Sequence, residues 1–194
     1  MIYRAKPPEA FDEAKAAQVA AFFTIRYGGV ADVWTLAKIV YLAERASYEK
    51  YGAPLIGDKL FSMPHGPVLS ETLNYIRNES DTPETWATYF EPRVDNNIPL
   101  RDTHLREETL LRLSDADVEL LNEVWNRFGS MSPNRLWRFT HALPEYERTE
   151  SSSIPVKMDV LLSHLGYDAQ QAAEIIERIE EQNNFKAALK RAAV

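Results

Sequence analysis

The sequence predicts a mainly α protein of the α+β class, a single-domain helical bundle of about six to eight helices with a small antiparallel three-stranded β-sheet or hairpin. Several stretches carry apolar residues at intervals of three and four, which is the period of an amphipathic helix. Glycine and proline separate these stretches, and two short apolar runs, 60–63 and 98–101, have the length of strands. A chain of 194 residues is long enough to bury one sizeable core.

The first two helices follow a short amino-terminal arm at 1–8. The first is predicted over 11–27 and ends at a pair of glycines. Asp32 is the expected N-cap of the second helix, because a short carboxylate accepts hydrogen bonds from the free N–H groups of a first turn. The second helix ends at Gly52, where glycine readily takes a left-handed conformation. Its buried stripe consists of Val33, Leu36, Val40 and Ala43.

A strand, a tight turn and a third helix are predicted next. The strand covers 59–63, and the run PHGP at 64–67 places two prolines and a glycine in the turn. The second of these prolines suits the first turn of a helix, so we expect the third helix over 68–78. Two further strands, 86–94 and 98–101, are expected to flank a tight Asp-Asn-Asn turn and to form one sheet with the first strand.

The remaining segments are predicted to be helical. Ser114 begins a helix with a capping box completed by Asp117, and Gly129 ends that helix. The pair Ser132-Pro133 begins the next one. Helices over 155–165 and from Asp168 to the end of the chain follow. The apolar side of the last helix consists of Ala172, Ile175, Ile176, Ile179, Phe185 and Leu189.

The composition indicates which kinds of partner are improbable and in which compartment the protein is expected. A formal net charge of -7 argues against a nucleic-acid backbone as the main partner, because phosphate binding depends on clustered Lys and Arg. Small basic groups, Arg135 with Arg138 and the trio Lys186, Lys190 and Arg191, read as solvated surface. The apolar runs are too short for a membrane span, the amino terminus lacks the apolar core of a signal peptide, and there is no cysteine. We therefore expect a cytoplasmic protein with no membrane partner.

No residue pattern points to catalysis, a cofactor or a metal ion. The histidines are scattered, and none forms a pair at metal-ligand spacing: His65, His104, His141 and His164. Motifs for a zinc helix, a nucleophile turn, a phosphate-binding loop and a dinucleotide fold are absent from the sequence. We expect no catalytic residue, no cofactor and no metal. A small enzyme acting through His65 and nearby acids stays open as an alternative.

Two long segments together resemble a known family. Residues 36–73 read LAKIVYLAERASYEKYGAPLIGDKLFSMPHGPVLSETL, and residues 113–147 read LSDADVELLNEVWNRFGSMSPNRLWRFTHALPEYE. Both are similar to the Panacea domain of the SocA-like antitoxins, a family also catalogued as phage-associated proteins. Its pattern has a K-L-x-Y-L-A-[DE]-R helix, the turns Y-G-x-P-[IL]-x-G-D and M-P-x-G-P-V-x-S, and later T-H-x-x-P-x-[WY]. The resemblance covers most of residues 11–157.

The resemblance implies an antitoxin of a bacterial or phage toxin-antitoxin pair. Such a protein would neutralise a co-encoded protein toxin by direct binding, and small alarmone synthetase-like enzymes are prominent among the toxins that the family pairs with. An alternative is a proteolytic adaptor that delivers the toxin to an ATP-dependent protease. We expect the antitoxin domain at 1–157 and a helical extension at 158–194, packed on the domain or projecting from it. A homodimer or a toxin-antitoxin heterocomplex is compatible with this reading.

The expected partner-binding surface combines the turn at 63–68 with the exposed side of the second helix. A rigid scaffold often presents binding residues on such turns, and His65 is either a contact residue or a turn residue bonded to backbone. Trp137 is either core or, between two arginines, a binding hot spot. We expect Lys38 to pair with a carboxylate such as Glu44, and we assign Trp34 to the core. The candidate partner-binding residues are Tyr41, Arg45, Tyr48, Met63, His65, Pro67 and Trp137.

Overall fold

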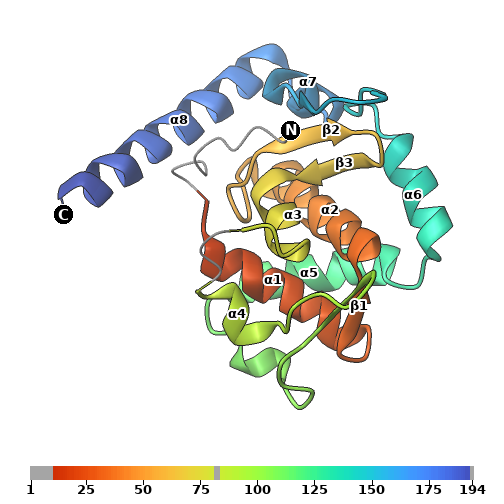
Figure 1. Ribbon diagram of the computed structural model, residues 1–194. Coiled ribbons are helices and arrows are strands. Elements are labelled where there is room, and N and C mark those ends of the chain that lie inside the picture. The colour runs from red at the N-terminus through yellow and green to blue at the C-terminus, as the bar shows by residue number, and fades with distance from the viewer. Residues whose placement is uncertain (1–10, 81–83, 193–194) are drawn as a thin grey trace.

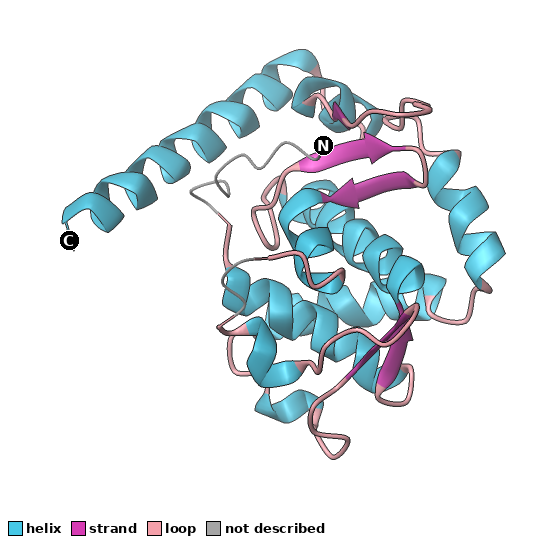
Figure 2. Ribbon diagram, viewed as in Figure 1, coloured by secondary structure: helices cyan, strands magenta, loops and turns pink. Residues whose placement is uncertain are grey.

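The computed structural model describes residues 11–80 and 84–192, with side chains as far as residue 189, so the predicted arm at 1–8 and the side chains of Lys190 and Arg191 lie outside it. The described helices are α1 (Glu13–Arg26), α2 (Val33–Tyr51), α3 (Ser70–Ile76), α4 (Trp86–Tyr89), α5 (Asp115–Phe128), α6 (Pro133–His141), α7 (Met158–His164) and α8 (Ala169–Ala192), with a 3-10 turn at Glu107–Thr109. The described strands are β1 (Val30–Asp32), β2 (Leu60–Met63), β3 (Gly66–Leu69), β4 (Asn97–Pro99) and β5 (Ile154–Pro155). The prediction of a mainly α protein with small antiparallel sheets is confirmed (Figure 2).

Helices α1 and α2 form the centre of the core (Figure 1). Every residue of α1 between Ala16 and Thr24 is buried, because α2, α4 and α5 surround this helix. Its four buried alanines let neighbouring backbones approach closely, and Phe22 and Phe23 fill the remaining volume. The helix α1 is therefore buried on all sides between Ala16 and Thr24.

The predicted helix ends are confirmed where a local hydrogen bond defines them. Asp32 caps α2, since its Oδ1 accepts from the backbone N–H of Thr35 at 2.8 Å. Gly52 ends α2 in the left-handed conformation, with φ at 58°. Ser114 and Asp117 form the capping box of α5.

The segment after the PHGP turn differs from its prediction. Residues 66–69 form β3, which pairs antiparallel with β2, so Met63 lies opposite Gly66 and Ser62 opposite Pro67. The helix α3 begins only at Ser70. Proline is compatible with β3 because this strand lies at the edge of its sheet. The expectation that Pro67 begins a helix is therefore wrong.

The predicted single sheet is also wrong, because the strands form two sheets. β4 pairs with β1, while β2 lies between β3 and β5. Residues 86–89 form the short helix α4 in place of a strand. The tight turn at 94–97 is present nevertheless, since the backbones of Val94 and Asn97 exchange two hydrogen bonds and Asp95 has a positive φ.

The helix α7 packs on the domain through Leu161 and Leu162, and α8 packs on it mainly through its first half. Ala172 and Ile175 of α8 are buried, and Arg178 donates a hydrogen bond from Nη2 to the carbonyl of Gly52 at 2.7 Å. Further along, α8 projects from the body of the molecule (Figure 1), and Phe185 and Leu189 are exposed. The predicted apolar side is therefore covered only in its first half. The predicted helix over 155–165 begins at Met158, because Ile154–Pro155 pairs with β2.

Among the helices that the structure describes, none has both the length and the apolar composition needed to cross a membrane.

Candidate partner-binding site

Two segments that are far apart in the sequence meet on one side of the molecule. The helix α2 and the β2–β3 hairpin come from the first segment, and α6 with the turn after it comes from the second (Figure 1). α6 packs against both α2 and β3. The contacts among these three elements build the candidate site.

Lys38 of α2 lies at the centre of this junction. It is 2% exposed, and its Nζ donates a hydrogen bond to the carbonyl oxygen of Pro67 at 2.9 Å. Burial, with a contribution from the charge of Arg77, lowers the pKa of Lys38 to about 7. The expected carboxylate pairing of Lys38 is wrong: in the described part of the chain, Glu44 faces the loop at 55–57 instead.

Gly66 lies directly against Lys38 and His141. Its φ is +97°, a conformation that side chains rarely adopt, and a Cβ here would lie 2.6 Å from Cε1 of His141 and 2.7 Å from Nζ of Lys38. His141 is held in place by the hydrogen bond that its Nδ1 donates to the carbonyl of Trp137 at 2.8 Å. Burial lowers the pKa of His141. Only glycine fits both the backbone and the space at position 66.

We expect Gly66→Ala to reduce the free energy of unfolding by about 2 kcal/mol, because it adds both backbone strain and a steric overlap. Gly28 is the matched control. It has a similar positive φ of +82° but no atom within 4 Å of a Cβ, so Gly28→Ala adds the strain alone and should cost about 1 kcal/mol or less. Urea unfolding of both variants measures the difference, and equal losses would show that the contact with Lys38 and His141 is unimportant.

Glu145 links α2 to the turn after α6. Its carboxylate is buried, and Oε1 accepts hydrogen bonds from the hydroxyl of Tyr41 at 3.2 Å and from Nε of Arg45 at 2.8 Å. Burial and the neighbouring carboxylate raise the pKa of Tyr41 well above its usual value. The three side chains therefore form a buried polar network that joins the two segments.

The same turn also fixes the hairpin. The hydroxyl of Tyr146 donates to the carbonyl of Met63 at 3.1 Å, and the backbone N–H of Glu147 donates to Oγ of Ser62 at 3.0 Å. The ring of Tyr146 packs against His141, with centroids 4.7 Å apart. The hairpin is thus held from α2 by Lys38 and from the α6 side by Tyr146.

Two buried carboxylates organise the loop before β2. Glu44 accepts hydrogen bonds from the backbone N–H groups of Leu55, Ile56 and Gly57 at 3.1, 2.7 and 3.1 Å. Burial raises the pKa of Glu44 to about 7 although these three donors favour its ionised form. Asp58 accepts from the N–H and hydroxyl of Thr72, both at 2.8 Å, at the start of α3. Glu44 of the A-E-R motif and Asp58 of the I-G-D motif therefore accept hydrogen bonds from backbone N–H groups and hold this loop and the start of α3 in place.

The structure separates the predicted site residues into two groups. Tyr41 and Tyr48 are buried, so neither belongs to the exposed side of α2 on which a partner could bind. Arg45 is largely covered by its ion pair with Glu145, and Pro67 is buried in β3. The remaining candidates reach the surface: Met63 is half-buried, and His65 and Trp137 are exposed.

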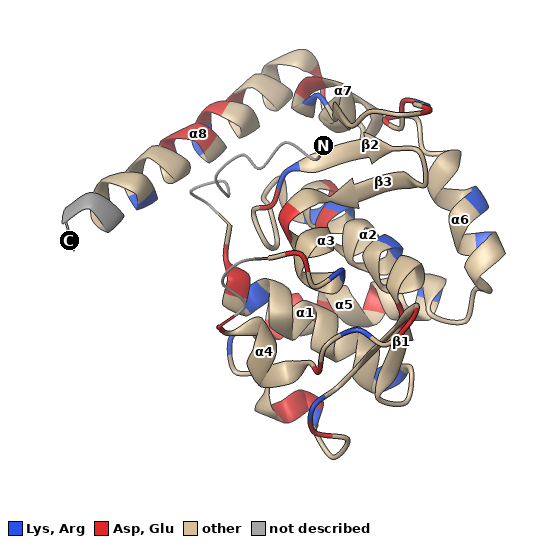
Figure 3. Cartoon of the chain, viewed as in Figure 1, with Lys and Arg blue, Asp and Glu red and all other residues tan. Residues whose placement is uncertain are grey.

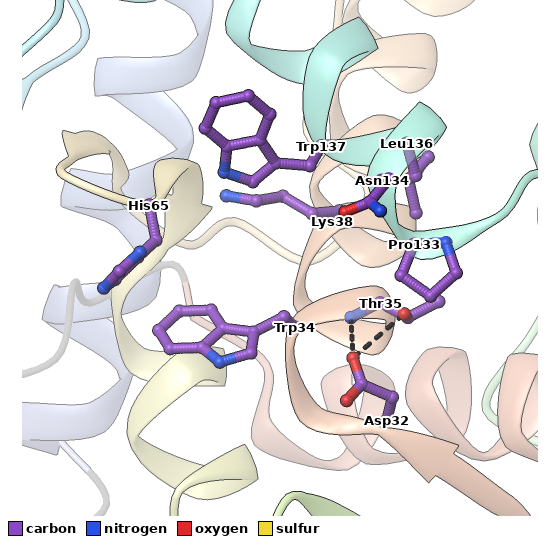
Figure 4. A pocket seen from close by; sticks show the side chains of 9 residues that line it. All are labelled: Asp32, Trp34, Thr35, Lys38, His65, Pro133, Asn134, Leu136 and Trp137. Atoms are coloured by element: carbon purple, nitrogen blue, oxygen red, sulfur yellow. Dashed lines mark hydrogen bonds between the residues drawn. The ribbon is translucent and has the colours of Figure 1, made fainter.

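A cavity of about 250 Å³ opens beside the exposed pair (Figure 4). Lys38 runs into it between the indole rings of Trp34 and Trp137 in this view, and His65 lies at one edge. The other lining residues are Asp32, Thr35, Pro133, Asn134 and Leu136. The cavity is therefore built from α2, the hairpin turn and α6, the same elements that the buried network holds together.

Trp34 and Lys38 line this cavity, so the expectation that Trp34 belongs to the core is wrong. Trp34 is half-buried on the cavity wall, in contact with the ring of His65 at 4.8 Å and with the guanidinium of Arg77 at 4.9 Å. The spacing of the two residues could have indicated this role. Trp34 and Lys38 are four residues apart, so they share a face of α2, and this face differs from the buried stripe that begins at Val33. That face leads toward α6.

Among the described residues, no group of three His, Asp or Glu side chains could hold a metal ion.

Comparison with known proteins identifies the family. The family model described as antitoxin SocA-like, Panacea domain, matches residues 36–146, more than half of the chain. No curated protein and no solved structure matches the chain. The matched region contains α2 from its second turn onward, the hairpin and α6, which build the network and most of the cavity. The chain therefore belongs to the SocA-like antitoxin family and carries its Panacea domain.

Proposed function

We propose that this protein neutralises a co-encoded toxin by binding it directly, without chemistry of its own, in a bacterial or phage toxin-antitoxin pair. The observation that carries the proposal is Trp137, which is 47% exposed at the rim of a cavity within a Panacea domain. Arg135 and Arg138 lie on either side of it along α6. Tryptophan and arginine are enriched among the residues that dominate the energy of protein interfaces.

The rigidity of the surrounding structure supports the same proposal. The hairpin turn is held by hydrogen bonds from Lys38 and Tyr146, and α6 is held to α2 by packing. A surface that is ordered before binding loses less conformational entropy when a partner docks. The exposed residues His65 and Trp137 are therefore presented on a preorganised frame.

The proposed partner is a protein, and a small alarmone synthetase-like toxin is the class that the family resemblance favours. The net charge of -7 suits a basic toxin, because complementary charge accelerates encounter. Figure 3 shows that the basic residues of α6 lie on its outward side, so this local surface would face acidic groups of the partner. A heterocomplex of toxin and antitoxin is the expected assembly.

Co-expression with the neighbouring gene tests the proposal. We expect the neighbouring product to arrest growth, the wild-type chain to restore growth and to co-purify with it, and Trp137→Ala to weaken the complex by about thirtyfold. Leu111→Ala is the control, since Leu111 is an exposed apolar residue outside the cavity, and this variant should bind like the wild type. If the complex is as tight with Trp137→Ala as with the wild type, α6 is not part of the interface. If the wild-type chain fails to restore growth, the proposed function is refuted.

The level of the toxin in the same cells separates neutralisation from the alternative of a proteolytic adaptor. Restored growth with a constant amount of toxin supports direct neutralisation. A fall in toxin that depends on an ATP-dependent protease would assign the adaptor role instead.

A further inference from the structure

We propose that the cavity beside Lys38 is an anchor pocket that receives one carboxylate side chain, Asp or Glu, from the partner protein. This inference rests on the proposed function, because it specifies which chemical group of the partner enters the site. The proposed function names a binding surface, and this inference names one contact within that surface.

The first argument is the incomplete hydrogen bonding of the lysine. An ammonium group has three N–H donors, and within the described residues the Nζ of Lys38 uses one of them, for the carbonyl of Pro67 at 2.9 Å. The side chain is 2% exposed, so surrounding water compensates little for the other two. Buried donors are normally satisfied, and an acceptor that enters the cavity would satisfy these.

The second argument is the shape and lining of the cavity. Its volume of about 250 Å³ leaves room for an Asp or Glu side chain, and Lys38 lies within it while Trp34 and Trp137 form apolar walls (Figure 4). Such walls suit the methylene groups of an acidic side chain and leave its carboxylate for the lysine.

The third argument is charge. Besides Lys38 and His65, one further ionisable residue lines the cavity, Asp32, and both of its oxygens already accept hydrogen bonds, Oδ1 from Thr35 and Oδ2 from Asn96. Arg77 stacks on the outer wall, with its guanidinium 4.9 Å from the ring of Trp34. Because burial and Arg77 disfavour the charged form of Lys38, a carboxylate beside it would relieve an existing penalty.

The surroundings favour a protein as the source of this carboxylate. The exposed ring of Trp137 and the exposed turn at 64–65 adjoin the cavity, so a partner that inserts one side chain could also cover a wider area. A free small anion would use the lysine alone. Hot-spot side chains at protein interfaces commonly fill such central pockets and pair with a hot spot of the partner.

Blocked amino acids test the pocket without the toxin. The probes are N-acetyl-glutamate methylamide, the corresponding glutamine derivative and inorganic phosphate, observed through the indole N–H signals of Trp34 and Trp137 in NMR titrations. We expect the glutamate probe to bind at least about tenfold more tightly than the glutamine probe, and Lys38→Met to remove this preference. Lys50→Met, the same change at an exposed position of α2, should keep it. Equal binding of the two probes, or tighter binding of phosphate, would overturn the proposal.

The toxin complex provides the second test. Lys38→Met should weaken it by about thirtyfold, and Lys50→Met should not. A complex that is weakened by Trp137→Ala but tolerates Lys38→Met would overturn the anchor while leaving the proposed function intact. If the wild type forms no complex, the proposed function fails, and the probe titrations alone decide the carboxylate preference. Urea unfolding of Lys38→Met confirms that the variant is folded in both tests.

Discussion

Glu44→Ala is expected to reduce the free energy of unfolding by about 3–5 kcal/mol, which is a large part of the stability of an ordinary domain. The substitution removes the acceptor of three backbone N–H groups at Leu55, Ile56 and Gly57, and it leaves the buried N–H groups of Leu55 and Ile56 without a partner. It also leaves a cavity at a fully buried position of α2. Urea unfolding followed by circular dichroism measures the loss.

Glu49→Ala is the control for this prediction. Glu49 lies on the same helix, is exposed, and makes one longer ion pair with Arg45 at 3.6 Å. Surface ion pairs of this kind contribute little, so the expected change is within about 0.5 kcal/mol. A loss for Glu44→Ala no larger than that for Glu49→Ala would mean that the loop at 55–57 does not depend on the carboxylate.

Lys38 is expected to make the stability of the protein depend on pH above neutrality. Its pKa is about 7 in the folded protein and has its usual value of 10.5 in an unfolded chain. Between these values the unfolded state binds a proton that the folded state does not bind, so the free energy of unfolding falls as the pH is lowered. From pH 9.5 to pH 7 this group should remove about 3 kcal/mol, and below pH 7 its contribution becomes constant.

The variant Lys38→Met isolates this contribution. It lacks the titrating amine. The free energy of unfolding of Lys38→Met minus that of the wild type should therefore increase as the pH falls from 9.5 to 7. Other titrating groups act on both proteins and cancel in the difference. Lys50→Met should follow the wild type at every pH in this range. A constant difference between Lys38→Met and the wild type would show that the buried amine keeps an ordinary pKa.

The two predictions concern residues that the family pattern contains, and the structure gives both a physical role. Lys38 binds the hairpin through Pro67, and Glu44 binds the loop that precedes the hairpin. Gly66 lets the hairpin approach Lys38 and His141. The motif residues therefore form a connected frame, and the cavity with Trp34 and Trp137 lies where this frame reaches the surface.

The features that the sequence predicts correctly depend on neighbours a few residues away. Asp32 caps the helix that begins next to it, Ser114 and Asp117 cap α5, and Gly52 ends α2. The PHGP turn is also predicted correctly, because proline and glycine restrict the backbone wherever they stand. Such interactions can be read from spacing alone, since both partners lie within one helical turn or one tight turn.

The expectations that fail depend on partners far along the chain. Nothing around β4 indicates that it pairs with β1, because the two strands are only three residues long and about 65 residues apart. The exposed face predicted for Tyr41 is closed by Glu145, which is 104 residues away. Within the described residues, Lys38 donates to the hairpin carbonyl of Pro67, and the expected partner Glu44 binds the loop at 55–57, which follows in the chain but packs on another side of α2.

The sequence by itself therefore determined the helices α2, α5 and α6, their caps, the tight turns and the family, since local hydrogen bonds and backbone restrictions encode them. Only the tertiary structure decided which side chains reach the surface. Trp137 is exposed and Tyr48 is buried although both lie on amphipathic helices, because burial depends on which element packs over each face. The cavity beside Lys38 exists only where α2, the hairpin and α6 meet, and no single segment contains it.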